Sequence, residues 1–341
     1  MTPSAHDPLL QQAQVWADAG LGLALATVMQ TWGSSPCPAG SLMVVNAETG
    51  FAGSVSGGCI ETSVVSECLE IIRDGGVEVL EYGISDEQGA AAGLACGGTV
   101  RVLVELLTPD LLAQLMGPSG FARVVDVTSG TWSTVRDGIT TGALALCDAA
   151  LETTAQALID ERPCSYEDAD QRYFIHPMMP PYQMIVIGAV RIAQALVPMA
   201  MQAGFEVTVI DPRKAFATQE RFSDVNLICD WPDMALQDIT LDRHTAVVTM
   251  IHDAKPDDMA LALALRSEAF YIGSLGSRKT HAKRAERLHL FGFDQAAINR
   301  IHAPIGLDIG GRSPAEIAVS ILAQVIAAKN QKLPLSGKTA S

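Results

Sequence analysis

The chain has 341 residues, of which 48% are hydrophobic and 18% charged, and this composition excludes an intrinsically disordered protein. Its formal net charge of -15 argues against binding to nucleic acid or to anionic membranes. The seven cysteines are scattered without a CxxC pair, and neither a secretory signal nor a membrane-spanning run is evident, so we expect a cytoplasmic protein with reduced thiols.

Before Pro180 and Pro181, short predicted strands alternate with turns and helices. The strands cover 23–31, 41–46, 77–82 and 99–107. A helix is predicted from Gly57-Gly58 through Arg73, closed by Gly75-Gly76. Residues 121–136 favour a hairpin. We therefore expect an α/β domain over 1–118 and a connecting region with a hairpin over 119–181.

After Pro181, strands and helices alternate regularly. The predicted strands cover 184–187, 205–210, 246–251 and 270–272. This alternation predicts a Rossmann-like, doubly wound parallel sheet over 182–330. Its last helix is expected to begin at Ser313, where Pro314 and Glu316 complete a capping box. Residues 331–341 are expected to form a frayed tail.

The turn after the first strand of this half nearly fits a dinucleotide-binding fingerprint. Gly188 allows the tight turn, Ala193 permits close helix packing, and Asp211 follows at the distance expected of a ribose-binding acid. The middle glycine is replaced by Val190, whose side chain should obstruct the usual NAD(P) pose. The alternatives are an NAD(P)-dependent oxidoreductase and a Rossmann-like fold without nicotinamide binding.

A basic segment follows the strand over 270–272. It holds five of the 23 Lys and Arg residues, namely Arg278, Lys279, Lys283, Arg284 and Arg287. Their spacing places Lys279, Lys283 and Arg287 on one helix face. Helix-start N–H groups and the Ser277 hydroxyl add donors to these cations, so the segment predicts an anion site. A solvated helix face is the alternative. His252, at the end of another strand, is a weaker candidate for the same edge of the sheet.

Two cysteines lie beside glycine pairs. Cys59 follows Gly57-Gly58 near a helix start, where the helix dipole lowers a thiol pKa, and Cys96 precedes Gly97-Gly98. Glycine-rich steps also supply free N–H groups that form an anion-binding nest. Both cysteines are therefore candidate reactive thiols, with structural packing as the alternative. Cys68, inside a helix, is expected to be buried.

These segments together resemble the XdhC/CoxI family. The resembling stretches of the first half are Gly33-Ser-Ser-Pro36, Gly53-Ser-Val-Ser-Gly-Gly-Cys59-Ile-Glu61 and Ala95-Cys-Gly-Gly98. Those of the second half are Val209-Ile-Asp-Pro-Arg213, 216–222, 271–278, 304–310 and 313–322. The resemblance covers both halves in order, and only the region between about 121 and 180 matches weakly.

The resemblance implies a chaperone that binds molybdenum cofactor, as molybdopterin or its cytosine dinucleotide, and protects it. It also implies support of cofactor sulfuration and delivery to a molybdenum hydroxylase such as xanthine, aldehyde or carbon monoxide dehydrogenase. A cysteine desulfurase and a second copy of the chain are further candidate partners. A maturation factor is thus favoured over a turnover enzyme.

The same resemblance suggests roles for particular residues. The cofactor carries a phosphate or pyrophosphate, which needs a local cationic site. Its candidate binding residues are Gly57, Gly58, Gly97, Gly98, Gly188, Asp211, Arg213, His252, Ser277, Arg278 and Lys279. A thiol close to the cofactor would relay sulfur or hold the metal transiently, and Cys96 is the candidate molybdenum contact.

Overall fold

The computed structural model describes residues 8–32, 37–58, 60–84, 98–168 and 170–330. The chain forms two compact units, Met1–Pro180 and Pro181–Ser341. We call them the first and the second unit and describe each by itself. Among the described helices, none is both long enough and apolar enough to cross a bilayer.

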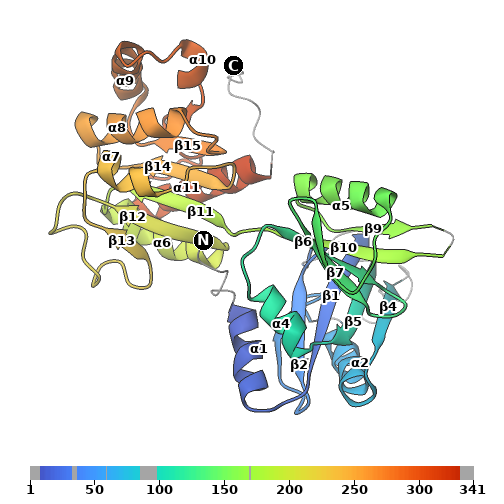
Figure 1. Cartoon of the computed structure of the whole chain (residues 1–341). Helices are drawn as coiled ribbons and strands as arrows, with labels where there is room; N and C mark the ends of the chain where they lie inside the picture. The colour runs from blue at the N-terminus through green and yellow to red at the C-terminus, as the bar shows by residue number, and fades with distance from the viewer. Residues whose placement is uncertain (1–7, 33–36, 59, 85–97, 169, 331–341) are drawn as a thin grey trace. The chain divides into compact units, whose positions relative to one another are not determined.

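The first unit begins with an antiparallel sheet in the order β3-β2-β1-β5-β4 (Figure 1). Its strands are β1 (Leu23–Trp32), β2 (Leu42–Asn46), β3 (Phe51–Gly53), β4 (Val77–Ile84) and β5 (Gly98–Leu106). The four strands expected here are confirmed. Helix α2 (Glu61–Asp74) packs Val64, Cys68 and Ile71 against one face of the sheet. Helices α1 (Pro8–Asp18) and α4 (Pro109–Leu115) pack on its other face.

A second antiparallel sheet follows in the order β8-β7-β6-β10-β9. Its elements are β6 (Phe121–Asp126), β7 (Trp132–Arg136), β8 (Ile139–Gly142), α5 (Asp148–Asp160), β9 (Cys164–Glu167) and β10 (Arg172–Met178). The expected hairpin is β6–β7. The region between 119 and 180 thus contains a complete sheet covered by α5, and it belongs to the first compact unit.

The two sheets of the first unit share a buried interface. Met29 and Leu103 of the first sheet pack with Val125 and Phe174 of the second. Beside them, Arg123 of β6 donates through Nη1 to Glu105 of β5 at 2.8 Å, and both side chains are almost fully buried. Removing either partner would leave a buried charge without its counterion, so this pair fixes how the sheets meet.

The second unit contains a parallel sheet in the order β13-β12-β11-β14-β15-β16. Its strands are β11 (Tyr182–Ile187), β12 (Phe205–Ile210), β13 (Asn226–Ile228), β14 (Thr245–Thr249), β15 (Tyr271–Ser274) and β16 (Ile301–His302). This is the strand order of the Rossmann fold, so the predicted doubly wound sheet is confirmed.

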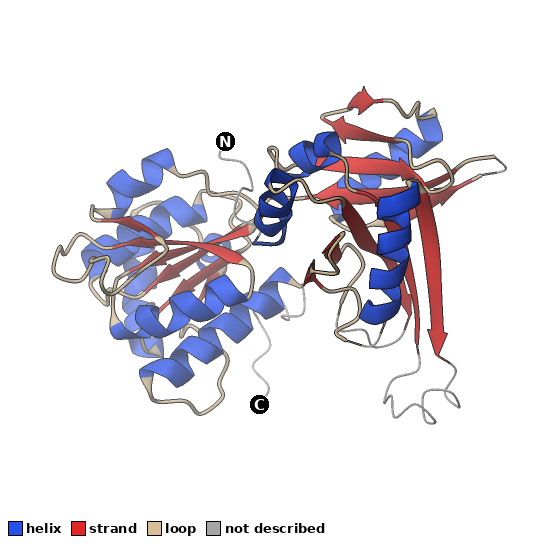
Figure 2. Cartoon of the chain, turned by 90° about the horizontal axis from the view of Figure 1, so that it is seen from below, coloured by secondary structure: helices blue, strands red, loops and turns tan. Residues whose placement is uncertain are grey.

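Helices cover both faces of this sheet (Figure 2). They are α6 (Arg191–Gln202), α7 (Pro232–Ala235), the short 3-10 helix η1 (Leu236–Asp238), α8 (Ala254–Leu265), α9 (Arg278–Leu290), α10 (Gln295–Ile298) and α11 (Pro314–Lys329). Met184 and Val186 of β11 face the core under α6 and α11, whereas Ile185 and Ile187 face the core under α8 and α9. Because residues 184–187 of β11 are buried on both faces, this run is continuously apolar rather than alternating. The predicted capping box at Ser313 is also present.

Candidate functional site

The turn after β11 lies at the carboxyl edge of the parallel sheet. Gly188 has φ +120°, and its N–H donates to the Ile210 carbonyl at 2.8 Å. A Cβ added to Gly188 would lie 2.8 Å from the backbone nitrogen of Ile251, which follows β14. The glycine is therefore required by the close approach of two chain segments. Sheets of this strand order bind ligands in the crevice at the carboxyl ends of their two central strands. Here these strands are β11 and β14, and Gly188 lies at that position.

Asp211 holds this turn from the end of β12. Its side chain is fully buried, and Oδ2 accepts from the Ala189 N–H at 2.8 Å and from Arg213 Nη2 at 2.7 Å. Oδ1 accepts from the Arg213 N–H and Nε, both at 2.9 Å. Burial alone would raise the pKa of Asp211, but the hydrogen bonds from Arg213 and Ala189 lower it overall.

The structure thus brings Gly188, Asp211 and Arg213 together. Because four N–H groups already bind the Asp211 carboxylate, this acid ties the turn to Arg213 instead of offering a free oxygen to a ribose. The Arg213 guanidinium lies 4.0 Å from the centre of the Phe216 ring and stays partly exposed. Val190 is the N-cap residue of α6 and packs against the core under α6 and α11.

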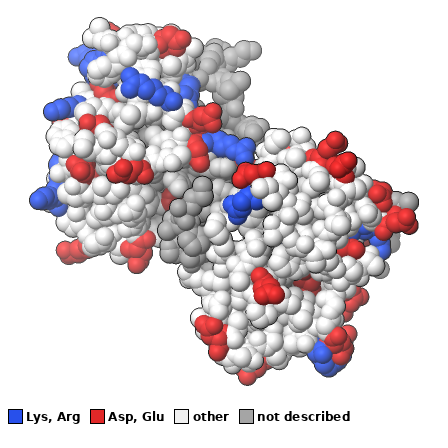
Figure 3. Space-filling view, viewed as in Figure 1, with Lys and Arg blue, Asp and Glu red and all other residues white. Residues whose placement is uncertain are grey.

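A pocket of about 260 Å³ lies between the segment after β14 and the basic helix α9. Its lining residues are His252, Asp253, Ala254, Asp257, Lys279, Thr280, Lys283, Arg284 and Arg287. The structure therefore gathers His252 with Lys279, as both were expected at this edge of the sheet. In Figure 3, several Lys and Arg side chains are visible where α8 and α9 lie.

The start of α9 lies beside this pocket rather than in it. Ser277 is the N-cap, and its hydroxyl accepts from the Thr280 N–H at 3.2 Å. Ser277 and Arg278 are exposed and are not among the described residues that line the pocket. The expected basic cluster is present, but its pocket begins at Lys279.

Arg284 is the buried cation of the pocket. Its side chain is 3% exposed, and its nearest carboxylates are Asp258 at 3.6 Å and Asp257 at 3.9 Å. Burial lowers the pKa of Arg284 and raises the pKa of Asp257 to about 6, although the two opposite charges favour ionisation of each other. Arg287 completes the network by pairing with Asp258.

The sequence analysis predicted only part of this network. It identified the helix face of Lys279, Lys283 and Arg287, but not the burial of Arg284 against α8. The spacing contained a signal, because Arg284 and Arg287 are three residues apart and therefore share one helix face. In the structure, both side chains on this face contact Asp258. His252 contributes a backbone feature, since it has φ +65° and its N–H donates to Asp257 Oδ2 at 3.1 Å.

The predicted N–H nest around Gly57 and Gly58 is present in the first unit, and the carboxylate of Glu61 fills it. Oε1 accepts from Ser54 Oγ at 2.6 Å, the Ser56 N–H at 2.9 Å and the Gly57 N–H at 3.0 Å. Oε2 accepts from Ser56 Oγ at 2.5 Å, the Gly58 N–H at 2.9 Å and the Ile60 N–H at 3.2 Å.

These hydrogen bonds shift the pKa of the Glu61 carboxyl. Burial alone would raise the pKa of Glu61, but the bonds from Ser54, Ser56 and the backbone lower it to about 2. A cofactor anion therefore cannot use these N–H groups while Glu61 occupies them. The sequence signal for this cradle was an acid in the first turn of α2, three residues after the glycine pair.

The remaining candidates of the first unit are the cysteines. Cys59, Cys96 and Gly97 lie outside the described residues, and Gly98 is the first residue of β5. Cys68 is fully buried as expected, and burial raises its pKa to about 12. It is therefore a packing residue rather than a nucleophile.

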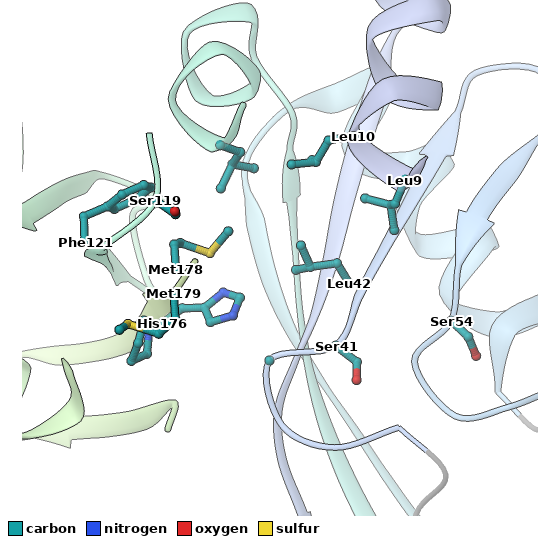
Figure 4. Close-up of a pocket in the computed structure, with 13 residues that line it drawn as sticks. Leu9, Leu10, Ser41, Leu42, Ser54, Ser119, Phe121, His176, Met178 and Met179 are labelled. Atoms are coloured by element: carbon teal, nitrogen blue, oxygen red, sulfur yellow. The ribbon is translucent and has the colours of Figure 1, made fainter. Parts of the chain in front are cut away.

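A larger pocket of about 460 Å³ in the first unit was not predicted (Figure 4). Its wall combines apolar residues with the Ser41, Ser54 and Ser119 hydroxyls and the His176 imidazole. Burial and the charge of Arg123 lower the pKa of His176 to about 4, so this imidazole is neutral at pH 7. The pocket therefore suits an uncharged group, and Ser54 links its wall to the Glu61 cradle.

Both units of the chain match known protein families. Residues 184–325 match the family described as XdhC Rossmann domain, and residues 16–83 match the XdhC and CoxI family. The chain belongs to the XdhC/CoxI family. In this XdhC/CoxI protein, the Asp211 turn and the α9 pocket lie within the first of these matches, and the Glu61 cradle lies within the second.

Similar proteins span nearly the whole XdhC/CoxI chain. The molybdenum cofactor insertion chaperone PaoD of Escherichia coli is 24% identical over 94% of this chain and 87% of its own length. A protein of Bacillus subtilis, named as a probable subunit of xanthine dehydrogenase, is 27% identical over 89% of this chain and 92% of its own. A crystal structure from Bacillus halodurans, described as a xanthine dehydrogenase, has a TM-score of 0.76 and 25% identity and covers 96% of this chain and 97% of its own.

Proposed function

We propose that this protein is a maturation chaperone that binds molybdenum cofactor, protects it and delivers it to a molybdenum hydroxylase. The observation that carries the proposal is the similarity across both units to a relative named as a molybdenum cofactor insertion chaperone. Family membership of each unit supports the same reading. We place this activity in the cytoplasm, where thiols stay reduced.

The α9 pocket supplies a local cationic site in a chain of net charge -15. Lys279, Lys283 and Arg287 line it from one helix face, and Arg284 lines it from a buried position. These residues fit the phosphate of the cofactor, which they would hold by charge-assisted hydrogen bonds. When bound, the cofactor supplies molybdenum and its dithiolene sulfurs, while the chain's own residues bind the phosphate and exclude water.

The sulfur chemistry rests on the sequence pattern. We propose Cys59 and Cys96 as the thiols that handle sulfur for the cofactor, with a cysteine desulfurase as the source. The Glu61 cradle organises the backbone directly before and after position 59, because it binds the N–H groups of Gly58 and Ile60. Glu61 is thus a positioning residue in this proposal.

An NAD(P)-dependent oxidoreductase is the second candidate, because the strand order of the second unit is that of the dinucleotide-binding fold. The Asp211 carboxylate opposes it, since its two oxygens already accept four N–H bonds. The chaperone therefore fits the described geometry better.

The test uses a strain that lacks this protein and produces a molybdenum hydroxylase of the same organism. We expect a folded hydroxylase with low molybdenum content, low cyanide-releasable sulfur and little activity, restored when the gene is returned. Metal analysis and cyanide treatment of the purified hydroxylase measure these quantities. Normal molybdenum, sulfur and activity in the deletion strain would contradict the maturation role.

A further inference from the structure

Arg284 is a buried cation with unused hydrogen-bonding capacity. Its Nε and Nη1 have no hydrogen-bond partner within the described part of the chain, although the side chain is 3% exposed. The carboxylates at 3.6 and 3.9 Å are near enough to compensate charge but too far for hydrogen bonds. Buried guanidinium donors normally find acceptors, so this residue points to an acceptor that the chain does not itself supply.

The charges around Arg284 favour an anion with more than one charge. Four cations and two carboxylates, Asp253 and Asp257, line the pocket. Arg287 is already paired with Asp258, so the cations left to meet a ligand are Arg284, Lys279 and Lys283. Asp253 caps α8 by accepting from the Lys255 N–H, and Asp257 accepts from the His252 N–H. Each carboxylate thus binds a backbone N–H, although Asp257 Oδ1 has no hydrogen-bond partner among the described residues. Lys279 and Lys283 are exposed at the pocket and able to turn toward a ligand.

The size of the pocket limits what enters it. Its volume of about 260 Å³ lies below the roughly 300–1,000 Å³ typical of sites for whole drug-sized ligands, so it takes one group of a ligand. A guanidinium fork beside lysines matches a tetrahedral group with several acceptor oxygens. A phosphate monoester offers two charges and three free oxygens, whereas a phosphodiester or a carboxylate offers one charge.

We propose that the pocket between α8 and α9 is a binding site for a phosphate monoester dianion, with Arg284 and Lys283 as its specificity-determining residues. The identity of the molecule that carries this phosphate rests on the proposed function. The site itself rests on the contacts of Arg284 and on the charges that line the pocket.

The test is calorimetric titration of the purified full chain with inorganic phosphate, glycerol 3-phosphate and dimethyl phosphate at low ionic strength. We expect both dianions to bind and the diester to bind at least about tenfold more weakly, because it has lost one charge. Lys283→Gln changes an exposed residue and should weaken dianion binding about tenfold. Arg284→Lys, with its fold checked by circular dichroism, should weaken it further because the fork is lost.

Two control variants separate the pocket from other sources of anion binding. Lys214→Gln removes one exposed positive charge of the second unit outside the pocket, and Arg278→Gln removes one at the start of α9. Both should bind within about twofold of the unchanged protein, because neither residue lines the pocket. If Lys214→Gln weakened phosphate binding as much as Lys283→Gln does, the binding would depend on overall charge alone. If Arg278→Gln did so, the phosphate would bind at the start of α9 instead of in the pocket.

The remaining outcomes also decide the proposal. The inference is wrong if neither dianion binds, if the diester binds equally well, or if inorganic phosphate binds while glycerol 3-phosphate is refused. These titrations use neither molybdenum cofactor nor a hydroxylase. A negative result would therefore leave the chaperone role standing, and normal hydroxylase maturation in the deletion strain would leave the phosphate site standing.

Discussion

Glu61 determines the conformation of the chain that enters α2. Its buried carboxylate collects two serine hydroxyls and the N–H groups of the glycine pair, so a segment rich in glycine is fixed by one side chain. Such a segment loses much conformational entropy when it is ordered. Hydrogen bonds to an ionised acceptor are the stronger kind and supply the compensation.

Glu61→Gln is therefore expected to destabilise the first unit. The amide keeps one oxygen but turns an NH₂ group toward N–H donors, which should lower the free energy of unfolding by about 1–3 kcal/mol at pH 7. Urea unfolding followed by tryptophan fluorescence measures this, since Trp16, Trp32 and Trp132 belong to the first unit. Glu70→Gln, at an exposed position of the same helix, should have little effect.

The pH dependence of this difference has a defined sign. The pKa of Glu61 is about 2 in the folded chain against an ordinary value of 4.5. A carboxylate with a lowered pKa stabilises the fold above its unfolded pKa, and that contribution is lost as the pH falls toward the folded value. The stability gap between the unchanged protein and Glu61→Gln should thus narrow from pH 4.5 downward. A gap that stays constant to pH 3 would show that the charge of Glu61 contributes nothing.

At the scale of elements, the spacing of residues along the sequence predicted individual strands and helices better than it predicted the contacts between them. Strands β11, β12, β14 and β15 of the Rossmann-like sheet were predictable because each contains a short apolar run between turn signals, and the capping box fixed the start of α11. Strands β13 and β16 were missed, because runs of 3 and 2 residues are too short to show a pattern. The helix face of Lys279, Lys283 and Arg287 followed from the helical period. The burial of Arg284 did not follow, because it depends on Asp257 and Asp258 of α8.

The first unit shows the same limit. The glycine pair at 57 and 58 correctly indicated N–H donors, but their acceptor was looked for in a ligand although it lies three residues further along the chain. The second sheet was missed for a similar reason. β8 is short and exposed throughout, and β9 is short and half exposed. Both are antiparallel to partners set by long-range register, which a local pattern does not encode.

The turn between β11 and α6 is the basis for predicting that this protein binds NADH and NADPH poorly. Val190 stands where a dinucleotide-binding turn has its second glycine, and Asp211 is engaged by Ala189 and Arg213. Titration with NADH and NADPH should therefore show no binding tighter than about millimolar, which corresponds to ~4 kcal/mol. A micromolar dissociation constant accompanied by hydride transfer would favour the oxidoreductase over the chaperone.

At the scale of the whole molecule, each unit has a hydrophobic core of its own. The two core clusters of the second unit contain residues of that unit alone, and the four clusters of the first unit are likewise confined to it. The boundary falls at Pro180-Pro181, where prolines disfavour a continuous helix or strand. The architecture is thus that of two folding units joined in one chain.

Separately produced chains of residues 1–180 and 181–341 are therefore expected to fold. Each should show a cooperative thermal transition and a circular dichroism spectrum in keeping with its elements, because the cut divides no core cluster formed by the described residues. The second unit alone should bind glycerol 3-phosphate within about threefold of the full chain, since the pocket residues all lie between His252 and Arg287.

Neither unit alone should restore hydroxylase activity in the deletion strain, because the proposed thiols and the phosphate pocket lie in different units. Restoration by the second unit alone would show that the first unit is not needed for maturation, and a second unit that folds but has lost phosphate binding would place part of the site outside it.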